Sequence, residues 1–508
     1  MRYLPGILMA ALIIVSPCMA RAKGDALVVA AFADAKNLDP QTLTDSVSQH
    51  INRQIYEPLV SVNAKGELVP RLAESWTVAE DGKTYIFTLK KGVKFHNNEE
   101  MTADDVVFTF KRAKSSAGAG THGLSFAIDP DSIKKIDEYT VAIGAFTKMG
   151  SVFLMAFNHP WASILSKKAV ERYGNDYGMN PVGTGRFKFA SWEKGDKVTL
   201  ERWEGYYGKP ATLKRMVFRA VVETVNRTIE LESGAVDMAL ELPEVDLPRL
   251  KANKDVAVHA FLGQSVNFLA FDVTAKPYDD WRVREAMNIV VDRPGILKAV
   301  FKGYGEIATG PLTSAVKYSK AKLTQDPPRD IAKAKKLLAE AGYPNGFKGK
   351  MLTPDRPFIT NMLVVLQANF KEIGLDMEIQ VYEMGSFYDV IRQQGHQPYA
   401  HGWWQGSPAP DPYFFLGPQF HSSMIGGTNR AFVKDAKVDE LLGKGAILND
   451  GPEREAVYHA VWDRINEIRP WIPIVNHLQF YATAKNLKGA DFEPILGMNT
   501  DLTQCYFE

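Results

Sequence analysis

Apolar and polar residues recur in short runs along most of the chain, and the period of each run predicts its secondary structure. A β-hairpin is expected over residues 76–89, where a β-rich run follows the turn pair Asp81-Gly82. A helix is expected after Asp330, which can cap a segment with apolar residues at helical spacing that ends at Gly342. Other expected strands are 27–32, 186–192, 198–203, 266–271, 379–382 and 472–476; other expected helices start at Thr102 or cover 226–233, 281–291, 363–373, 438–446 and 454–468.

These strands and helices alternate from one end of the chain to the other, which predicts an α/β protein with at least two sheets. At 508 residues the chain is too long for one compact core, so two or three domains are expected. The sequence contains no repeat at a fixed period and no long Gly/Ser linker. Short segments should therefore join the domains, as a hinge between lobes requires.

The first 22 residues have the pattern of a secretory signal peptide. Arg2 gives a positive start, and residues 4–15 form an apolar stretch too short for a stable membrane anchor. Ala20 and Ala22 place small residues where a signal peptidase cuts. We expect cleavage after Ala22 and a periplasmic location, with an uncleaved anchor or a buried N-terminal helix as the alternatives.

Charge and cysteine content narrow the function classes. Loss of the signal peptide changes the formal net charge from +1 to −1, so no broad preference for nucleic acid or anionic membranes is expected. The cleavage also removes Cys18 and leaves Cys505 alone, which excludes an intramolecular disulfide. No later apolar run approaches the roughly 20 residues of a membrane span, so the mature protein should be soluble.

Patterns typical of catalysis or metal binding are weak. His396 and His401 are five residues apart, but Pro398 breaks the stretch and the metalloprotease pattern is missing. Ser314 and Lys317 have Ser-x-x-Lys spacing, yet no Lys-Thr-Gly follows. We therefore expect no enzyme activity, no metal and no cofactor; an exported hydrolase is the minor alternative.

The most unusual segment is residues 401–415, HGWWQGSPAPDPYFF. Two adjacent tryptophans between glycines, followed by three prolines, exclude a regular helix and favour a strand that runs into a loop. Such a loop can present flat rings and polar groups to a cleft. Core packing is the alternative, and both can hold because neighbouring residues of a strand face opposite sides. The candidate ligand-binding residues of this segment are Trp403, Trp404, Gln405, Ser407 and Asp411.

Several motifs in order resemble the family 5 extracellular solute-binding proteins. Those are periplasmic components of ATP-driven (ABC) importers for dipeptides, oligopeptides, glutathione, nickel complexes and opines. The likeness extends from about residue 27 to 480. The motifs are YEPLV (56–60), LVPRLAESW (68–76), DGKTYIFTL (81–89), GVKFH (92–96), TADDV (102–106), NPVGTG (180–185), DWRVREA (280–286), AGYPNG (341–346) and DPYFF (411–415).

The resemblance implies a two-lobed periplasmic binding protein of the larger type, with an extra inserted domain. A small ligand would bind between the lobes, which close on it by hinge bending, and the partner would be an inner-membrane ABC permease. We expect a monomer; a periplasmic peptide chaperone or sensor without a transporter is the alternative. The implied division is a first lobe of 23–60, 181–271 and 479–508, an inserted domain of 61–180 and a second lobe of 272–478.

The resemblance also bears on the ligand. Peptide-binding members hold the ligand's amino group with a carboxylate three residues after the tryptophan of the Gly-Trp strand. Counted from Trp404 that position is Ser407, and counted from Trp403 it is Gly406, so neither is charged. A hydroxyl is a poor partner for a buried ammonium, which leaves Asp411, further along the loop, as a substitute. A peptide-like, glutathione-like or opine-like ligand is therefore expected rather than a plain peptide.

Two candidate ligand-binding residues lie outside the aromatic segment. Arg186 follows Gly183-Thr-Gly185 directly, where relatives usually have proline. A cation there could pair with a ligand carboxylate or phosphate, or it could be a surface arginine. Asn267, in the strand expected at 266–271, is the second candidate.

Overall fold

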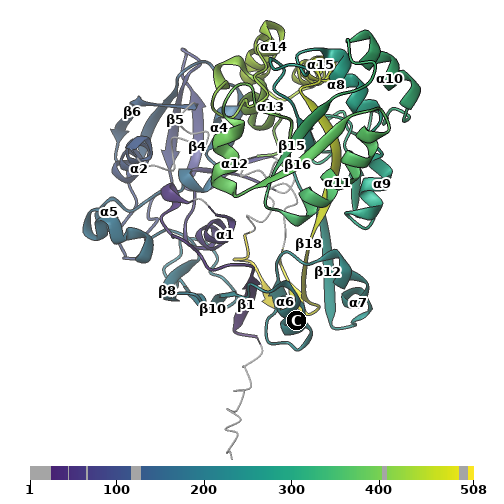
Figure 1. The fold of residues 1–508 in the computed structure, drawn as a ribbon. Helices are drawn as coiled ribbons and strands as arrows, with labels where there is room; N and C mark the ends of the chain where they lie inside the picture. The colour runs from purple at the N-terminus through teal and green to yellow at the C-terminus, as the bar shows by residue number, and fades with distance from the viewer. Residues whose placement is uncertain (1–23, 44, 64–66, 116–126, 403–408, 491–500) are drawn as a thin grey trace, which may run out of the picture.

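The computed structural model describes residues 24–43, 45–63, 67–115, 127–402, 409–490 and 501–508. Most strands of these residues form one mixed, 12-stranded sheet with helices on its faces, which confirms the α/β fold class. Figure 1 shows the sheet as two parts joined by the long strand β18 (Trp471–Ala484). The first half contains β1 (Ala26–Ala31), β8 (Phe187–Glu193), β9 (Lys197–Arg202), β10 (Arg215–Ala220), β11 (Met238–Ala239) and β12 (Val256–Leu262); the second contains β13 (Asn267–Ala270), β14 (Gly305–Ile307), β15 (Lys348–Pro354), β16 (Asp376–Tyr382) and β17 (Tyr399–Gly402).

Within the described ranges, the chain passes between the two sheet halves at two places that lie side by side. On β18, His477 pairs with Gly305 of the second half, and Leu478 pairs with Leu262 of the first. The other passage is residues 263–266, between β12 and β13. β13 pairs with β17 and β18, so strand pairing favours a crossing a few residues before the lobe boundary expected at 271. The lobe boundaries themselves stay a prediction.

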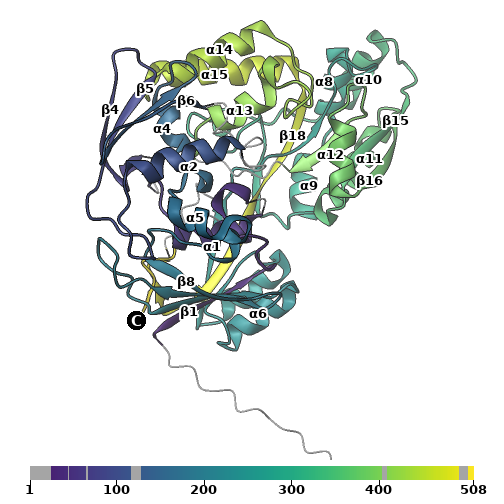
Figure 2. The same ribbon diagram turned by 90° about the vertical axis from the view of Figure 1, so that its left-hand side faces the viewer.

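A second, four-stranded sheet lies within the expected inserted domain. Its order is β4 (Ala73–Val78), β5 (Thr84–Leu89), β7 (Thr140–Ala145) and β6 (Ile128–Asp137). The expected hairpin is confirmed, since the carboxylate of Asp81 accepts from the backbone N–H groups of Lys83 and Thr84, both at 2.8 Å. Figure 2 shows this part of the chain beside helices α2 (Ala103–Ser115) and α5 (Lys167–Tyr173).

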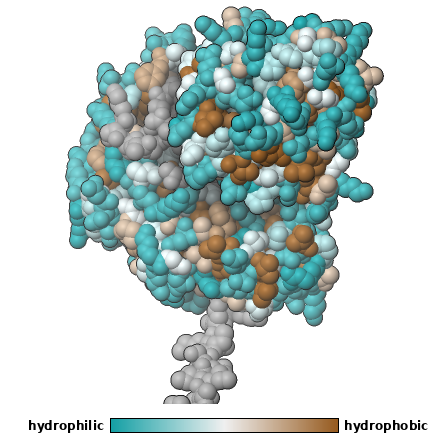
Figure 3. Space-filling view, in the orientation of Figure 1, coloured by the Kyte–Doolittle hydropathy of each residue, from teal (hydrophilic) through white to brown (hydrophobic). Residues whose placement is uncertain are grey.

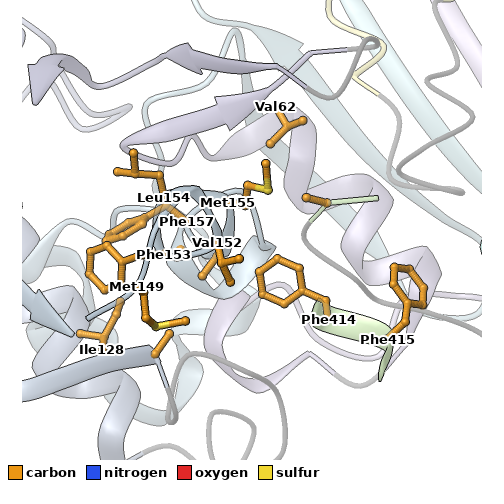
Figure 4. Packing of buried hydrophobic residues seen from close by; sticks show 14 of the residues in the cluster. Val62, Ile128, Met149, Val152, Phe153, Leu154, Met155, Phe157, Phe414 and Phe415 are labelled. Carbon is orange, nitrogen blue, oxygen red and sulfur yellow. The ribbon is translucent and has the colours of Figure 1, made fainter. Parts of the chain in front are cut away.

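The apolar run 152–157 forms a short buried helix, α4 (Ser151–Ala156), that links two parts of the molecule. Val152 and Phe153 share one core cluster with Phe414 and Phe415 of helix α13 (Tyr413–Phe420). Figure 4 shows this packing from close by. The N–H of Gly150 also donates to the carbonyl of Ala446, at 2.9 Å. The expected inserted domain is therefore packed against the expected second lobe on this side.

Most helices begin where capping residues predict them. Asp280 accepts from the backbone N–H of Arg282 at the start of α8 (Trp281–Ile289), and Asp330 does the same for Lys333 at the start of α10 (Ile331–Glu340). No helix of the described residues is long and apolar enough to cross a membrane. The remaining main helices are α1 (Ser46–Ile55), α6 (Thr224–Glu232), α7 (Leu247–Ala252), α9 (Arg293–Ala299), α11 (Pro357–Lys371), α12 (Met384–Ile391), α14 (Ala436–Ile447) and α15 (Pro452–Ile468).

Candidate ligand-binding cleft

The aromatic segment leaves the sheet at the end of β17, close to the boundary between the two sheet halves. β17 pairs with β13, and its last residue, Gly402, lies opposite Asn267. Trp403, Trp404, Gln405 and Ser407 follow directly and lie outside the described residues.

Asn267 is fully buried at the root of this segment. Its Nδ2 donates to the carbonyl of Val475 at 2.9 Å and lies 2.8 Å from Nδ1 of His477. Its Oδ1 has no hydrogen-bond partner within the described ranges, and a Cβ added at Gly402 would come within 2.6 Å of it. A buried acceptor left in this state is a strong candidate for a donor supplied by a ligand or a water molecule.

His401 precedes Gly402 and holds the end of β17 against α12. Its Nε2 lies 3.1 Å from the hydroxyl of Tyr388, and its Nδ1 lies 2.6 Å from the carbonyl of Gly402. Burial lowers the pKa of the ring to about 4, and the charges of Arg430 and Arg356 act in the same direction. His401 is therefore neutral at pH 7. No group of three possible metal-ligating side chains occurs in the part of the chain that the structure describes.

The protonation of His401 should make stability depend on pH. Its pKa is about 4 in the folded protein and 6.5 as the ordinary value. Between pH 6.5 and 4 the unfolded ring takes up a proton that the folded ring does not, so the free energy of unfolding should fall as pH falls through this window. In His401→Gln we expect a shallower dependence, by up to about 1.4 kcal/mol per pH unit. Urea unfolding at pH 7, 5.5 and 4.5 measures the free energy of unfolding of both proteins. The control is His421→Gln, because the side chain of His421 is 36% exposed. Equal slopes in wild type and His401→Gln would contradict this account.

Two charged residues that sequence reasoning missed come from opposite sheet halves and are close enough for the charge of Arg356 to act on the carboxyl of Glu241. Arg356 lies just past the end of β15, caps the start of α11, is exposed, and makes no ion pair with any described residue. Glu241 follows β11 with a left-handed backbone conformation, φ 49°. Glu241 is solvent-exposed, yet partial loss of hydration raises the pKa of its carboxyl, while the charges of Arg227 and Arg356 oppose that rise. Accessibility combined with reduced hydration is typical of a residue that lines a concave surface.

Apolar residues accompany these charges. On the face shown in Figure 3, apolar side chains gather along the boundary between the upper-right and lower parts of the molecule. The ring of Phe358, two residues after Arg356, packs against His477, with ring centroids 5.6 Å apart. Apolar walls with a few placed polar groups are the usual composition of a small-molecule site.

Asp411 takes part in a buried ion pair instead of presenting its charge to a ligand. Its two oxygens accept from the guanidinium of Arg454 on α15, with Nη2 to Oδ1 at 2.8 Å, and the side chains are 0% and 1% exposed. Oδ1 also accepts from the backbone N–H of Tyr413, at 3.0 Å. The sequence suggested that Asp411 could substitute for the carboxylate missing at Ser407. Because both of its oxygens are bonded to Arg454, the structure does not support that role.

Arg186 lies in the first sheet half, away from the boundary. Its guanidinium packs over the ring of Tyr206 at 4.7 Å, and its Nε donates to the carbonyl of Lys209 at 3.0 Å. Its Nη1 donates to the hydroxyl of Thr503 at 3.0 Å. The structure therefore brings Asn267 and the root of the aromatic segment together, but not Arg186.

The Ser-x-x-Lys spacing at 314–317 does not form a catalytic pair. Oγ of Ser314 donates to Glu306 at 2.7 Å, whereas Nζ of Lys317 pairs with Asp450 at 2.9 Å. The two side chains therefore bond to different carboxylates, Glu306 and Asp450, and not to each other.

Comparison with known proteins identifies the family. The model of the bacterial extracellular solute-binding proteins, family 5 middle region, matches residues 67–426. The chain belongs to this family. The glutathione-binding protein GsiB of Escherichia coli strain K12 is 30% identical over 485 residues, which cover 93% of each chain.

Solved structures agree with this family assignment. The periplasmic binding protein DppA of Helicobacter pylori, in complex with the peptide STSA, superposes with a TM-score of 0.81 at 28% identity, covering 95% of this chain and 98% of that one. A dipeptide-binding protein of Pseudoalteromonas sp. SM9913, in complex with Met-Leu, has a TM-score of 0.81 at 26% identity, covering 95% and 100%. DppA is named as an ABC transporter-associated periplasmic binding protein, and the other two are named as dipeptide- and glutathione-binding proteins, so the predicted fold, family and solute-binding role are confirmed.

Proposed function

We propose that this protein captures a zwitterionic, peptide-like ligand between the two sheet halves and delivers it to a membrane ABC permease. Glutathione is the first candidate, because GsiB is named as glutathione-binding and covers nearly the whole chain. The observations that carry the proposal are the unsatisfied buried acceptor of Asn267 at the root of the aromatic segment and the charges of Arg356 and Glu241, which come from opposite halves of the sheet. In this account the protein acts in the periplasm as a monomer, without catalysis.

The two charges can divide the recognition of a zwitterion. Arg356 suits a ligand carboxylate, since a guanidinium can donate two parallel hydrogen bonds to it. Glu241 suits an ammonium and would supply from the opposite half the negative charge that Ser407 lacks. Trp403, Trp404, Gln405 and Ser407 are proposed to cover the ligand from the segment after β17, beside the unsatisfied acceptor of Asn267.

A ligand held in this way would also stabilise the closed arrangement. Arg356 and Glu241 belong to different halves of the sheet, so a molecule that pairs with both binds best when the halves are close together. Ligands shift a conformational equilibrium by the difference in their affinities for its two states. A permease could then distinguish loaded from empty protein by its shape.

Thermal denaturation with a ligand panel tests the proposal. Glutathione, Met-Leu, a neutral tripeptide, an opine and a nickel–histidine complex are each added over a range of concentrations. We expect glutathione to raise the melting temperature progressively, as a ligand specific for the folded state does. A panel in which no compound raises it would contradict the proposal. Cleavage after Ala22 remains a separate prediction that N-terminal sequencing of the exported protein would check.

A further inference from the structure

A cavity lies on the first-lobe side of the molecule, apart from the boundary between the sheet halves. Its volume is about 140 Å³, and its walls come from the end of α1, the hairpin of β2 (Val60–Val62) and β3 (Leu68–Pro70), residues 185–186 and the C-terminal segment. Among the described residues, none that lines it belongs to the second sheet half. Neither Arg356 nor Glu241 lines it, so it is distinct from the proposed ligand site.

Three guanidinium groups and two carboxylates line this cavity. The cations are Arg53, Arg71 and Arg186, and the acids are Glu57 and Asp501. With all five side chains ionised, the described residues that line the cavity carry one more positive than negative charge. It also explains the position of Arg186, which borders this cavity rather than the cleft.

The carboxylate of Glu57 is already occupied by other donors. It accepts from the hydroxyls of Tyr206 at 2.9 Å, Tyr207 at 3.2 Å and Thr184 at 3.2 Å. Its nearest contact with Arg71 is 3.9 Å, too long for a hydrogen bond. Burial raises the pKa of Glu57, against the opposing charges of Arg71 and Arg186. Glu57 is therefore bound mainly by neutral hydroxyl groups and makes no direct hydrogen bond to Arg71.

Arg71 is the guanidinium best placed to receive a guest. Its Nη2 pairs with Asp501 at 3.2 Å, and the side chains of both residues remain partly exposed, at 30% and 38%. Partly exposed ion pairs contribute little stability, so an incoming anion can compete for Arg71 at little cost. Arg186 would add a second positive charge through space, because its guanidinium already donates to the carbonyl of Lys209, the hydroxyl of Thr503 and the amide oxygen of Gln504.

We propose that this cavity binds a small anion, a carboxylate or a phosphate group, through Arg71 and Arg186. Its volume of about 140 Å³ exceeds the roughly 10–15 Å³ that one water molecule needs. A group of several heavy atoms therefore fits.

Binding of inorganic phosphate and of acetate to the full mature protein tests this proposal. Thermal denaturation is followed in Tris buffer at constant ionic strength while chloride is replaced by either anion. We expect a saturable rise in melting temperature for wild type and for Arg215→Gln, which removes an exposed arginine outside the cavity. In Arg71→Gln and Arg186→Gln the apparent affinity should fall at least tenfold. The anion with the stronger effect in wild type distinguishes a phosphate site from a carboxylate site.

The decisive variant is Arg71→Gln, because Arg71 is partly exposed and its loss should not prevent folding. An equal anion effect in wild type, Arg71→Gln and Arg186→Gln would overturn the proposal, and so would a rise that never saturates. Arg356→Gln should leave the anion effect unchanged, and Arg71→Gln should leave glutathione binding unchanged. Failure of the anion site and failure of the cleft proposal are therefore distinguishable.

Discussion

Replacing Asp411 by asparagine is expected to lower the free energy of unfolding by about 3 kcal/mol or more. Arg454 has a fully buried side chain, and the substitution would leave its charge without its main counter-charge. Asp450 also lies 3.0 Å from Arg454, but it is 36% exposed and compensates only in part. Urea unfolding at pH 7, followed by tryptophan fluorescence, measures the loss.

The matched control is Glu440→Gln, which breaks an ion pair with Lys437 at the surface. Both side chains of that pair are more than half exposed, at 62% and 55%, so a change below about 1 kcal/mol is expected. If Asp411→Asn instead unfolds like wild type but loses ligand affinity, the side chain belongs to the ligand site. That result would contradict the structural role argued here.

The second large effect is expected for Arg356→Gln in ligand binding. Loss of a charge-assisted hydrogen bond to a ligand carboxylate costs about 1.5–3 kcal/mol, which corresponds to roughly a 10- to 100-fold weaker affinity. Titration calorimetry with glutathione measures it. Because Arg356 is exposed and makes no ion pair among the described residues, the free energy of unfolding should change by less than about 0.5 kcal/mol.

Lys371→Gln, at the other end of α11, is the control for this experiment. It removes one exposed positive charge from the same helix without approaching the cleft, so glutathione affinity should remain that of wild type. Equal affinities for Arg356→Gln and wild type would mean that the carboxylate is recognised elsewhere. Equal losses in both variants would indicate a general effect of charge rather than a specific contact.

Local signals predicted the local structure well. Asp81-Gly82, Asp280 and Asp330 each satisfy backbone N–H groups of neighbouring residues, so short stretches of sequence were enough to place the hairpin and two helix starts. The start of α11 was predicted wrongly, at 363 instead of Pro357, because the apolar pattern becomes regular only after Leu363. Similarly, β18 is much longer than the expected strand at 472–476, since pairing with both sheet halves extends it.

Candidate site residues could be predicted from the sequence only where they lie in one short segment with a recognisable pattern. The aromatic segment was proposed because it has an unusual pattern along the chain, and the structure places Asn267, the candidate in the strand at 266–271, at the root of that segment. Asp411 was misjudged because its partner, Arg454, is 43 residues away. Arg356 and Glu241 were missed for the same reason, although an arginine between a strand and a Pro-initiated helix could have been noticed.

The central claim is that the protein holds a small organic ligand between its two sheet halves. Native mass spectrometry of freshly purified, periplasm-derived protein tests it most directly. We predict a population heavier than the polypeptide by the mass of a small zwitterion, lost on denaturation and regained when glutathione is added. A spectrum with only the polypeptide mass, unchanged by glutathione and by every other compound of the panel, would contradict the account.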